Sequence, residues 1–292
     1  MPYAEATRDI SYASAAPTRR GRALIRAVEN LTGRRKLIAR AQGYQTDVAL
    51  GRSFWQVMPD RFGLTLEVAG GSLANIPRTG PLVVIANHPY GILDGLMMGQ
   101  LLDAQRGDFR ILAHSVFRQA AEVNRILLPI SFAETKEAVR LNLETRANAL
   151  TYLGCGGAIG VFPGGTVSTA AKPFSQAMDP SWRNFTAKMI AKSGATVVPI
   201  YFEGQNSRLF QIASHLHASL RLALLIKEFK NRTDEPVRVV IGEPIPADTI
   251  DALKCDPTAM METLRRVTYA LSPRPLRSYA NGYEFEAKYK SR

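Results

Sequence analysis

The chain has 292 residues, of which 46% are hydrophobic and 21% are charged, as is ordinary for a folded globular protein. This length fits one α/β domain or two small domains, and the composition excludes disorder across the whole chain. The net charge of +12 suggests attraction to an anionic partner, either a lipid surface or a nucleic acid. Cys155 and Cys255 match no metal or redox spacing, so reduced thiols are expected, and neither a metal nor a cofactor is implied.

The first 43 residues carry half of the positive excess. They hold nine Arg or Lys and three Asp or Glu, a balance of +6. Residues 1–18 are predicted to be a disordered leader without the apolar core of a secretory signal. Residues 19–43 are predicted to form a basic amphipathic helix in two pieces, broken near Gly33. This pattern is typical of a helix docked on an anionic membrane, although a helix packed on its own domain has the same pattern.

Strand and helix patterns alternate through the rest of the chain, up to residue 272. Such alternation predicts an α/β fold with a mixed, mostly parallel sheet covered by helices. Residues 44–272 are expected to form this domain, and residues 273–292 a loosely held basic tail. The predicted strands are 82–87, 109–114, 127–132, 158–162, 196–202 and 237–241, and the predicted helices are 93–105, 136–153, 182–192, 208–229 and 258–270.

The most informative segment, 81–95, reads Pro-Leu-Val-Val-Ile-Ala-Asn-His-Pro-Tyr-Gly-Ile-Leu-Asp-Gly. An apolar strand leads directly into His88, where open α/β folds place their ligands, and a turn then brings Asp94 to the start of a helix. A carboxylate beside the imidazole would fix its tautomer and leave the other ring nitrogen to accept a proton. Spacing alone is equally consistent with a structural histidine that caps a turn.

Two later segments also place a strand before a distinctive sequence. Segment 155–169 ends a strand in Phe-Pro-Gly-Gly-Thr-Val-Ser, where glycines let main-chain N–H groups approach a ligand and Thr166 and Ser168 add hydroxyls. A tight left-handed turn would look the same. Strand 196–202 contains Pro199, which predicts an irregular or edge position.

Taken in order, the three segments resemble the lysophospholipid acyltransferase family, the glycerolipid acyltransferases. Its members carry a His-x4-Asp block after a strand, a Phe-Pro-Glu-Gly-Thr block and a Val-Pro-apolar strand. These blocks correspond here to His88 with Asp94, to residues 162–166 and to residues 198–200. The resemblance covers residues 20–270 and is nearest to a bacterial branch that includes lysophosphatidic acid and lyso-ornithine lipid acyltransferases.

The resemblance implies transfer of an acyl group from acyl-CoA or acyl-acyl carrier protein to the free hydroxyl of a lysolipid. The expected acceptor is 1-acyl-sn-glycerol-3-phosphate, which would give phosphatidic acid. A lyso-ornithine lipid acceptor and a non-catalytic lipid-binding relative remain as alternatives. His88 is the expected general base and Asp94 its partner. No Gly-x-Ser-x-Gly motif occurs, which argues against a covalent acyl-enzyme hydrolase.

An enzyme of this kind is expected to lie peripherally on the cytoplasmic face of the inner membrane, bound to anionic lipid. Nucleic acid is not an expected partner, because stacking aromatics do not interleave with the basic helix.

The sequence departs from the family pattern at three positions. Five residues, not four, separate His88 from Asp94, Gly164 replaces the glutamate of the second block, and Val167 stands where an arginine is frequent. These losses leave the contact to an acceptor phosphate unassigned, with Lys172, Lys136, Arg140 and Arg183 as basic candidates. The expected substrate-binding residues are Asn87, Gly91, Gly164, Gly165, Thr166, Ser168 and Lys172.

Overall fold

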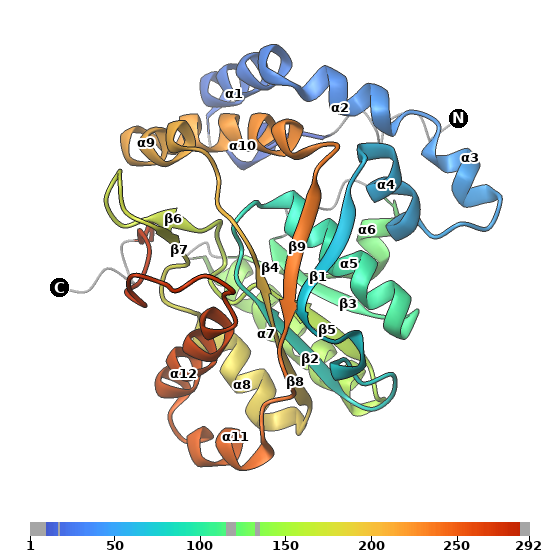
Figure 1. Ribbon diagram of the computed structural model, residues 1–292, viewed down its shortest axis with the longest axis vertical. Helices are drawn as coiled ribbons and strands as arrows, with labels where there is room; N and C mark the ends of the chain where they lie inside the picture. Colours follow the sequence, from blue (N-terminus) through green and yellow to red (C-terminus); the bar gives the residue numbers. More distant parts are fainter. Residues whose placement is uncertain (1–9, 17, 115–120, 132–134, 287–292) are drawn as a thin grey trace.

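A seven-stranded sheet forms the centre of the computed structural model, which describes residues 10–16, 18–114, 121–131 and 135–286 (Figure 1). Five neighbouring strands run parallel, and the other two, parallel to each other, run antiparallel to them. The predicted α/β fold with a mixed, mostly parallel sheet is therefore confirmed. In spatial order the strands are β1 (Thr65–Gly71), β9 (Pro236–Ile241), β8 (Thr196–Phe202), β2 (Leu82–Ala86), β5 (Ala158–Val161), β3 (Arg110–His114) and β4 (Leu127–Ile130).

Helices cover both faces of the sheet. Leu82, Val84 and Ala86 of β2 pack toward one face, and Val83 and Ile85 toward the other, and all five are fully buried. A strand buried on both faces reads as a continuous apolar run, as this one does. The first face carries α4 (Phe54–Phe62), α5 (Ile92–Arg106) and α10 (Ala218–Arg232), and the second carries α7 (Lys136–Gly154), α8 (Asn184–Ser193) and α12 (Pro257–Ala270).

An outer helical layer lies over α10, as Figure 1 shows at the top of the molecule. It consists of α1 (Arg19–Thr32) and α2 (Arg34–Ala41), separated at Gly33, which has φ +155°. The two-piece helix broken near Gly33 is thus present. Ile25 of α1 is fully buried and belongs to one cluster with Ala223 of α10. Among the described residues no helix is both long and apolar enough to cross a bilayer.

The disordered leader predicted for residues 1–18 is wrong for residues 10–16. Ser11 and Tyr12 are buried because the Glu29 carboxylate of α1 accepts their O–H and N–H groups at 2.5 and 2.7 Å. A short 3-10 helix, Ala13–Ala15, follows. Burial raises the pKa of the Glu29 carboxyl above its ordinary value, although the two hydrogen bonds act to lower it. Residues 1–9 and 17 lie outside the described residues.

The loosely held tail predicted for residues 273–292 is also wrong for its described part. Arg265 of α12 donates to the carbonyls of Tyr279 and Ala280, and Gly282 N–H donates to the carbonyl of Asp179. Glu284 pairs with the buried Arg183 at 2.8 Å. These contacts hold residues 273–286 on the domain.

Several local predictions differ from the structure. Predicted helix 208–229 is two helices, α9 (Arg208–Leu216) and α10, because His217 is extended and caps α10 through its side chain. Pro199 lies in the interior strand β8, where its carbonyl accepts from Gly242 just beyond the end of β9. The elements not predicted are β1, β6 (Thr169–Ala170), β7 (Ala177–Met178), α3 (Tyr44–Ala49), α4, α6 (Ala121–Ile126) and α11 (Ala247–Leu253).

Replacement of Glu29 by Ala is expected to release residues 10–16. The variant leaves the buried Ser11 hydroxyl and Tyr12 N–H without their acceptor, at a cost of about 1–3 kcal/mol. Hydrogen exchange should then be faster across residues 10–16, and thermal unfolding should begin at a lower temperature. Leu24→Ala on the exposed side of the same helix is the control. Equal exchange in the two variants would contradict this account of the segment.

Candidate active site

The turn between β2 and α5 begins with a side chain that joins two strands. Asn87 donates through Nδ2 to the carbonyl of Phe202 at 2.9 Å and accepts from its N–H through Oδ1 at 2.7 Å. The ends of β2 and β8 are thereby held together. Both polar groups of the expected substrate-binding residue Asn87 are used within the fold. Its role in this structure is to fix where the next residue, His88, begins.

His88 and Asp94 meet across this turn. Nδ1 of His88 lies 2.9 Å from Oδ2 of Asp94, whose side chain is fully buried, whereas the imidazole is 18% exposed. The same Oδ2 accepts the N–H groups of Tyr90 and Gly91 at 2.7 and 3.0 Å. Gly91 has φ +86°, a conformation that glycine adopts without strain, and this turn accommodates the fifth intervening residue.

The Asp94 carboxylate sits in an environment that opposes its ionisation. Burial raises the pKa of the Asp94 carboxyl, while the His88 imidazole and the N–H groups of Tyr90 and Gly91 act in the other direction. A hydrogen on Nδ1 directed at Asp94 leaves Nε2 of His88 as the proton acceptor. The pair has the arrangement that a general base and its orienting carboxylate require.

Two further contacts hold His88 in place. Its ring stacks on Phe162, the residue that follows β5, with ring centroids 4.3 Å apart and planes inclined by 24°. Its carbonyl accepts the N–H of Ser168 at 2.8 Å, and its own N–H donates to the carboxylate of Asp179 at 3.2 Å. The ring and the main chain are therefore both constrained.

The second block, residues 162–168, packs beside His88 as a braced loop. Gly165, with φ +70°, donates its N–H to the carbonyl of Phe162 at 3.0 Å. Arg221 of α10 donates to the Thr166 hydroxyl and to the Val167 carbonyl, both at 2.9 Å. Ser168 donates its hydroxyl to Asp179 at 2.5 Å. The hydroxyls of Thr166 and Ser168, expected to bind substrate, thus have partners within the protein.

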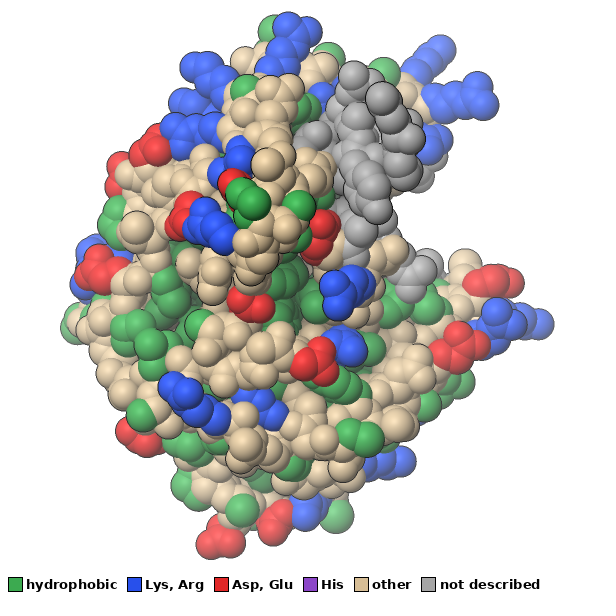
Figure 2. Space-filling view, turned by 90° about the vertical axis from the view of Figure 1, so that its right-hand side faces the viewer, with side chains coloured by type: hydrophobic (Ala, Val, Ile, Leu, Met, Phe, Trp, Pro, Cys, Tyr) green, Lys and Arg blue, Asp and Glu red, His purple; other side chains and the backbone are tan. Residues whose placement is uncertain are grey.

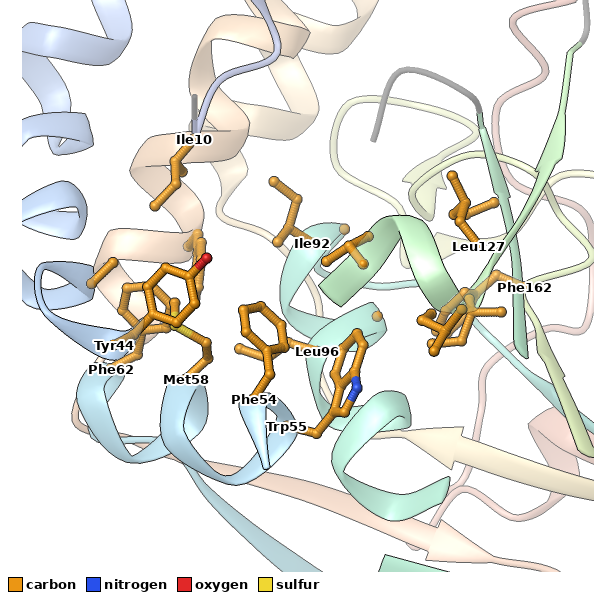
Figure 3. Close-up of a pocket in the computed structure, with 18 of the residues that line it drawn as sticks. Ile10, Tyr44, Phe54, Trp55, Met58, Phe62, Ile92, Leu96, Leu127 and Phe162 are labelled. Atoms are coloured by element: carbon orange, nitrogen blue, oxygen red, sulfur yellow. The ribbon is translucent and has the colours of Figure 1, made fainter. Parts of the chain in front are cut away.

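An apolar pocket of ≈ 230 Å³ opens beside His88 (Figure 3). It lies between α4, α5, α6 and β3, and Gly91 and Phe162 border it next to the imidazole. Ile10 and Ser11 contribute to its wall from the N-terminal segment. Figure 3 shows aromatic and aliphatic side chains facing this space from several elements, among them Tyr44, Phe54, Trp55, Met58, Phe62, Ile92, Leu96 and Leu127.

The basic candidates from the sequence do not line this pocket. Lys172, between β6 and β7, borders a separate polar hollow of ≈ 900 Å³ that also reaches Asn87 and Ser168. Lys136 and Arg183 border a third hollow beside Phe162, and Arg183 pairs with Glu284. Arg140 lies exposed on α7 and pairs with Glu144. Across the described residues, no three His, Cys, Asp or Glu side chains gather as a metal would require.

Three residues of this region had no signal in the sequence. Tyr12 is buried, and its hydroxyl accepts the N–H of Ile92, the first residue of α5, at 3.2 Å. Arg221 is buried beneath the second block, and burial lowers the pKa of its guanidinium to about 10. Asp179 follows β7 and is fully buried. Each makes contacts with a segment far away in the chain, and a local sequence pattern cannot predict such contacts.

Comparison with known proteins places most of the chain in one family. The acyltransferase family matches residues 34–273. The lyso-glycine lipid O-acyltransferase of Phocaeicola vulgatus is 25% identical over 232 residues, covering 76% of this chain and 78% of that protein. Its counterpart from Bacteroides thetaiotaomicron is 26% identical over 236 residues, covering 76% and 80%. A crystal structure of the 1-acyl-sn-glycerophosphate (LPA) acyltransferase PlsC from Thermotoga maritima matches with a TM-score of 0.48 and 17% identity, covering 87% of this chain and 97% of that one.

Replacement of Asp94 by Ala is expected to destabilise the protein as well as the site. The N–H groups of Tyr90 and Gly91 lose their acceptor, at a cost of about 2–4 kcal/mol. Asp103→Ala on the same helix is the control, and denaturant unfolding is the measurement. If the two variants unfold alike at neutral pH, Asp94 does not hold this turn.

The pH dependence of this difference has a defined sign. Because burial raises the folded-state pKa of Asp94, its ionisation opposes folding, and stability lost at higher pH returns as the pH falls. The advantage of the wild type over Asp94→Ala should therefore widen as the pH is lowered from neutrality through the raised pKa toward about 4.

Proposed function

We propose that this chain, which belongs to the acyltransferase family, moves a fatty acyl group from a thioester to the free hydroxyl of a lysolipid. The observation that carries the proposal is the His88–Asp94 pair at the edge of an apolar pocket. A base beside an apolar cavity suits a reaction in which one substrate is a long hydrocarbon chain. A non-catalytic lipid-binding relative would have no need of an imidazole held by a buried carboxylate.

The reaction follows from the geometry of the pair. Nε2 of His88 takes the proton of the acceptor hydroxyl while the hydroxyl oxygen attacks the thioester carbonyl. The C–S bond then breaks, and the imidazolium gives the proton to the departing thiolate. Asp94 orients the ring and stabilises its charged form. We assign the developing oxyanion to the N–H groups of Gly164 or Thr166, because those of Gly165 and Ser168 already donate within the protein.

The acyl chain of the donor and its thiol carrier are assigned to different spaces. The apolar pocket takes an acyl chain, with its reacting end toward His88. The polar hollow that reaches Asn87 and Ser168 carries Lys172, Arg208 and Arg232. These cations suit the phosphates of coenzyme A or the acidic surface of an acyl carrier protein.

We assign the acceptor to the lysolipids whose headgroup is an amino acid. Val167 is buried where the resembled family frequently carries an arginine, and Gly164 has no side chain to offer. The two curated relatives are both described as lyso-glycine lipid O-acyltransferases. We therefore propose a lyso-amino acid lipid, of the glycine or ornithine kind, in preference to the lysophosphatidic acid expected from the sequence.

The outer face of α1 is proposed to dock on an anionic membrane. Leu24 and Leu31 are 48% and 87% exposed, seven residues apart on this face. Figure 2 shows Lys and Arg side chains crowding the upper end of the molecule, where α1 and α2 lie in Figure 1. The exposed basic residues of these helices are Arg19, Arg20, Arg22, Arg35 and Lys36. Each contributes roughly 1 kcal/mol near an anionic surface. With this docking, the protein is assigned to the cytoplasmic face of the inner membrane.

A panel of acceptors tests the reaction and the headgroup together. Wild-type protein should acylate lyso-glycine or lyso-ornithine lipid at least about tenfold faster than lysophosphatidic acid, from acyl-CoA or acyl-acyl carrier protein.

His88→Ala should lower kcat by about 10²–10⁴-fold, because the general base is gone. His217→Ala, an exposed histidine at the start of α10, is the control. Near-normal transfer by His88→Ala would overturn the mechanism, and a preference for lysophosphatidic acid would overturn the headgroup.

Point substitution tests the docking face better than deletion, because residues 10–16 and α2 also border the pocket. Leu24→Glu/Leu31→Glu should lower binding to vesicles containing anionic lipid, measured by flotation, and raised salt should lower it further. Val139→Glu/Leu143→Glu is the control, since these residues are also apolar and exposed, on α7 across the sheet. Equal loss of binding in both pairs would mean that α1 has no special role.

A further inference from the structure

A buried carboxylate connects the two blocks of the candidate site. Asp179 follows β7 directly, and its side chain is fully buried. Oδ1 accepts the N–H of His88 at 3.2 Å and the hydroxyl of Ser168 at 2.5 Å, while Oδ2 accepts the indole N–H of Trp182 at 2.9 Å. Both oxygens therefore act as acceptors for donors on three separate segments.

These bonds close a ring around the peptide of His88. Ser168 N–H donates to the carbonyl of His88 at 2.8 Å. The Ser168 hydroxyl and the His88 N–H both donate to the carboxylate of Asp179. The peptide groups on both sides of the His88 Cα are held by this ring. Since the imidazole lies 2.9 Å from Asp94, any shift of the His88 main chain changes the position of its reactive nitrogen.

The carboxylate occupies space that a side chain at position 164 would otherwise enter. A Cβ on Gly164 would lie 3.3 Å from Cβ and Cγ of Asp179 and 3.4 Å from Oδ2. Gly164 stands where the resembled block has a glutamate. This chain thus has no carboxylate at position 164, and a carboxylate from a different segment lies in the space beside it.

We propose that Asp179 is a positioning residue for acyl transfer, taking the place left by Gly164 and fixing His88 and Ser168 relative to each other. The proposal rests on the proposed function of His88 as the general base. Asp179 acts through the main chain of His88 and takes no part in proton transfer. Its effect is expected on kcat more than on KM, because a displacement of about 1 Å costs on the order of 100-fold in rate.

Asp179→Asn tests the need for two accepting oxygens. The amide has one oxygen and cannot accept from both His88 and Trp182, so one N–H must face its NH₂ group. We expect kcat to fall roughly 10- to 100-fold with KM changed less than about threefold. Trp182→Phe removes only the donor to Oδ2, so the double variant Asp179→Asn/Trp182→Phe should recover most of kcat. A single variant with normal kcat, or a double variant no better than the single one, overturns the proposal.

Moving the carboxylate provides the second test. Gly164→Glu alone should lower kcat, since its Cβ crowds Asp179, and Asp179→Gly alone should lower kcat because the acceptor is lost. Gly164→Glu/Asp179→Gly should exceed both single variants by at least about tenfold. A double variant that is folded by circular dichroism but no more active than either single variant contradicts the proposal.

A readout independent of turnover separates this inference from the proposed function. In wild-type protein the amide of His88 is hydrogen-bonded to a carboxylate, so its NMR signal and slow hydrogen exchange should change in Asp179→Asn and persist in Trp182→Phe. If wild-type protein acylates no acceptor, the proposed function fails, and the amide still decides whether Asp179 holds His88. An unchanged His88 amide in Asp179→Asn overturns the positioning role whatever the activity.

Discussion

One buried carboxylate oxygen organises both the start of α5 and the position of the His88 ring. Oδ2 of Asp94 accepts two consecutive main-chain N–H groups and meets the imidazole of His88. The N-terminus of a helix has unpaired N–H groups and a positive electrostatic potential, which suit a carboxylate. The bonds that begin the helix therefore also fix the group that orients the histidine. The residue added to the turn does not break the pair, because Gly91 adopts a positive φ in the turn that places Asp94 beside both N–H groups.

Sheet topology brings the second block to this point. β2 and β5 are neighbours and run parallel, so their carboxyl ends lie side by side although many residues separate them in the chain. The residue after β5, Phe162, can then stack on His88, and Ser168 reaches its carbonyl. With Gly164 lacking a side chain, the loop leaves room beside it, and Asp179 fills that room from a third segment. Contacts between loops, more than contacts within them, define the geometry here.

The strands that could be predicted from the sequence are those whose apolar pattern matches their burial in the structure. All six predicted strands are present, since continuous apolar runs such as β2 are typical of strands buried on both faces. β1 was missed because it lies at the sheet edge, is only partly buried and contains glycine. The division between α9 and α10 was missed because His217, not a glycine or proline, interrupts the helix.

The site residues also differ in how far their contacts could be predicted from local sequence. His88 and Asp94 are six positions apart, so their meeting was foreseeable from the turn residues between them. The partners of Thr166 and Ser168 were not, because Arg221 and Asp179 reach them from α10 and from β7. Residues 10–16 looked disordered for a similar reason. These residues are mostly Ala and Ser and show no periodicity, and their order depends on a carboxylate in α1.

This N-terminal segment ties the site to the proposed docking face. Ile10 and Ser11 form part of the pocket wall, and Tyr12 accepts a hydrogen bond from the first residue of α5. The segment is held by Glu29, which lies on the inner side of α1, whereas Leu24 and Leu31 lie on its outer side. One helix thus supports the wall of the apolar pocket with one side and presents apolar and basic residues with the other. If α1 docks on a bilayer as proposed, the segment that forms this pocket wall would be held by the same helix that contacts the lipid.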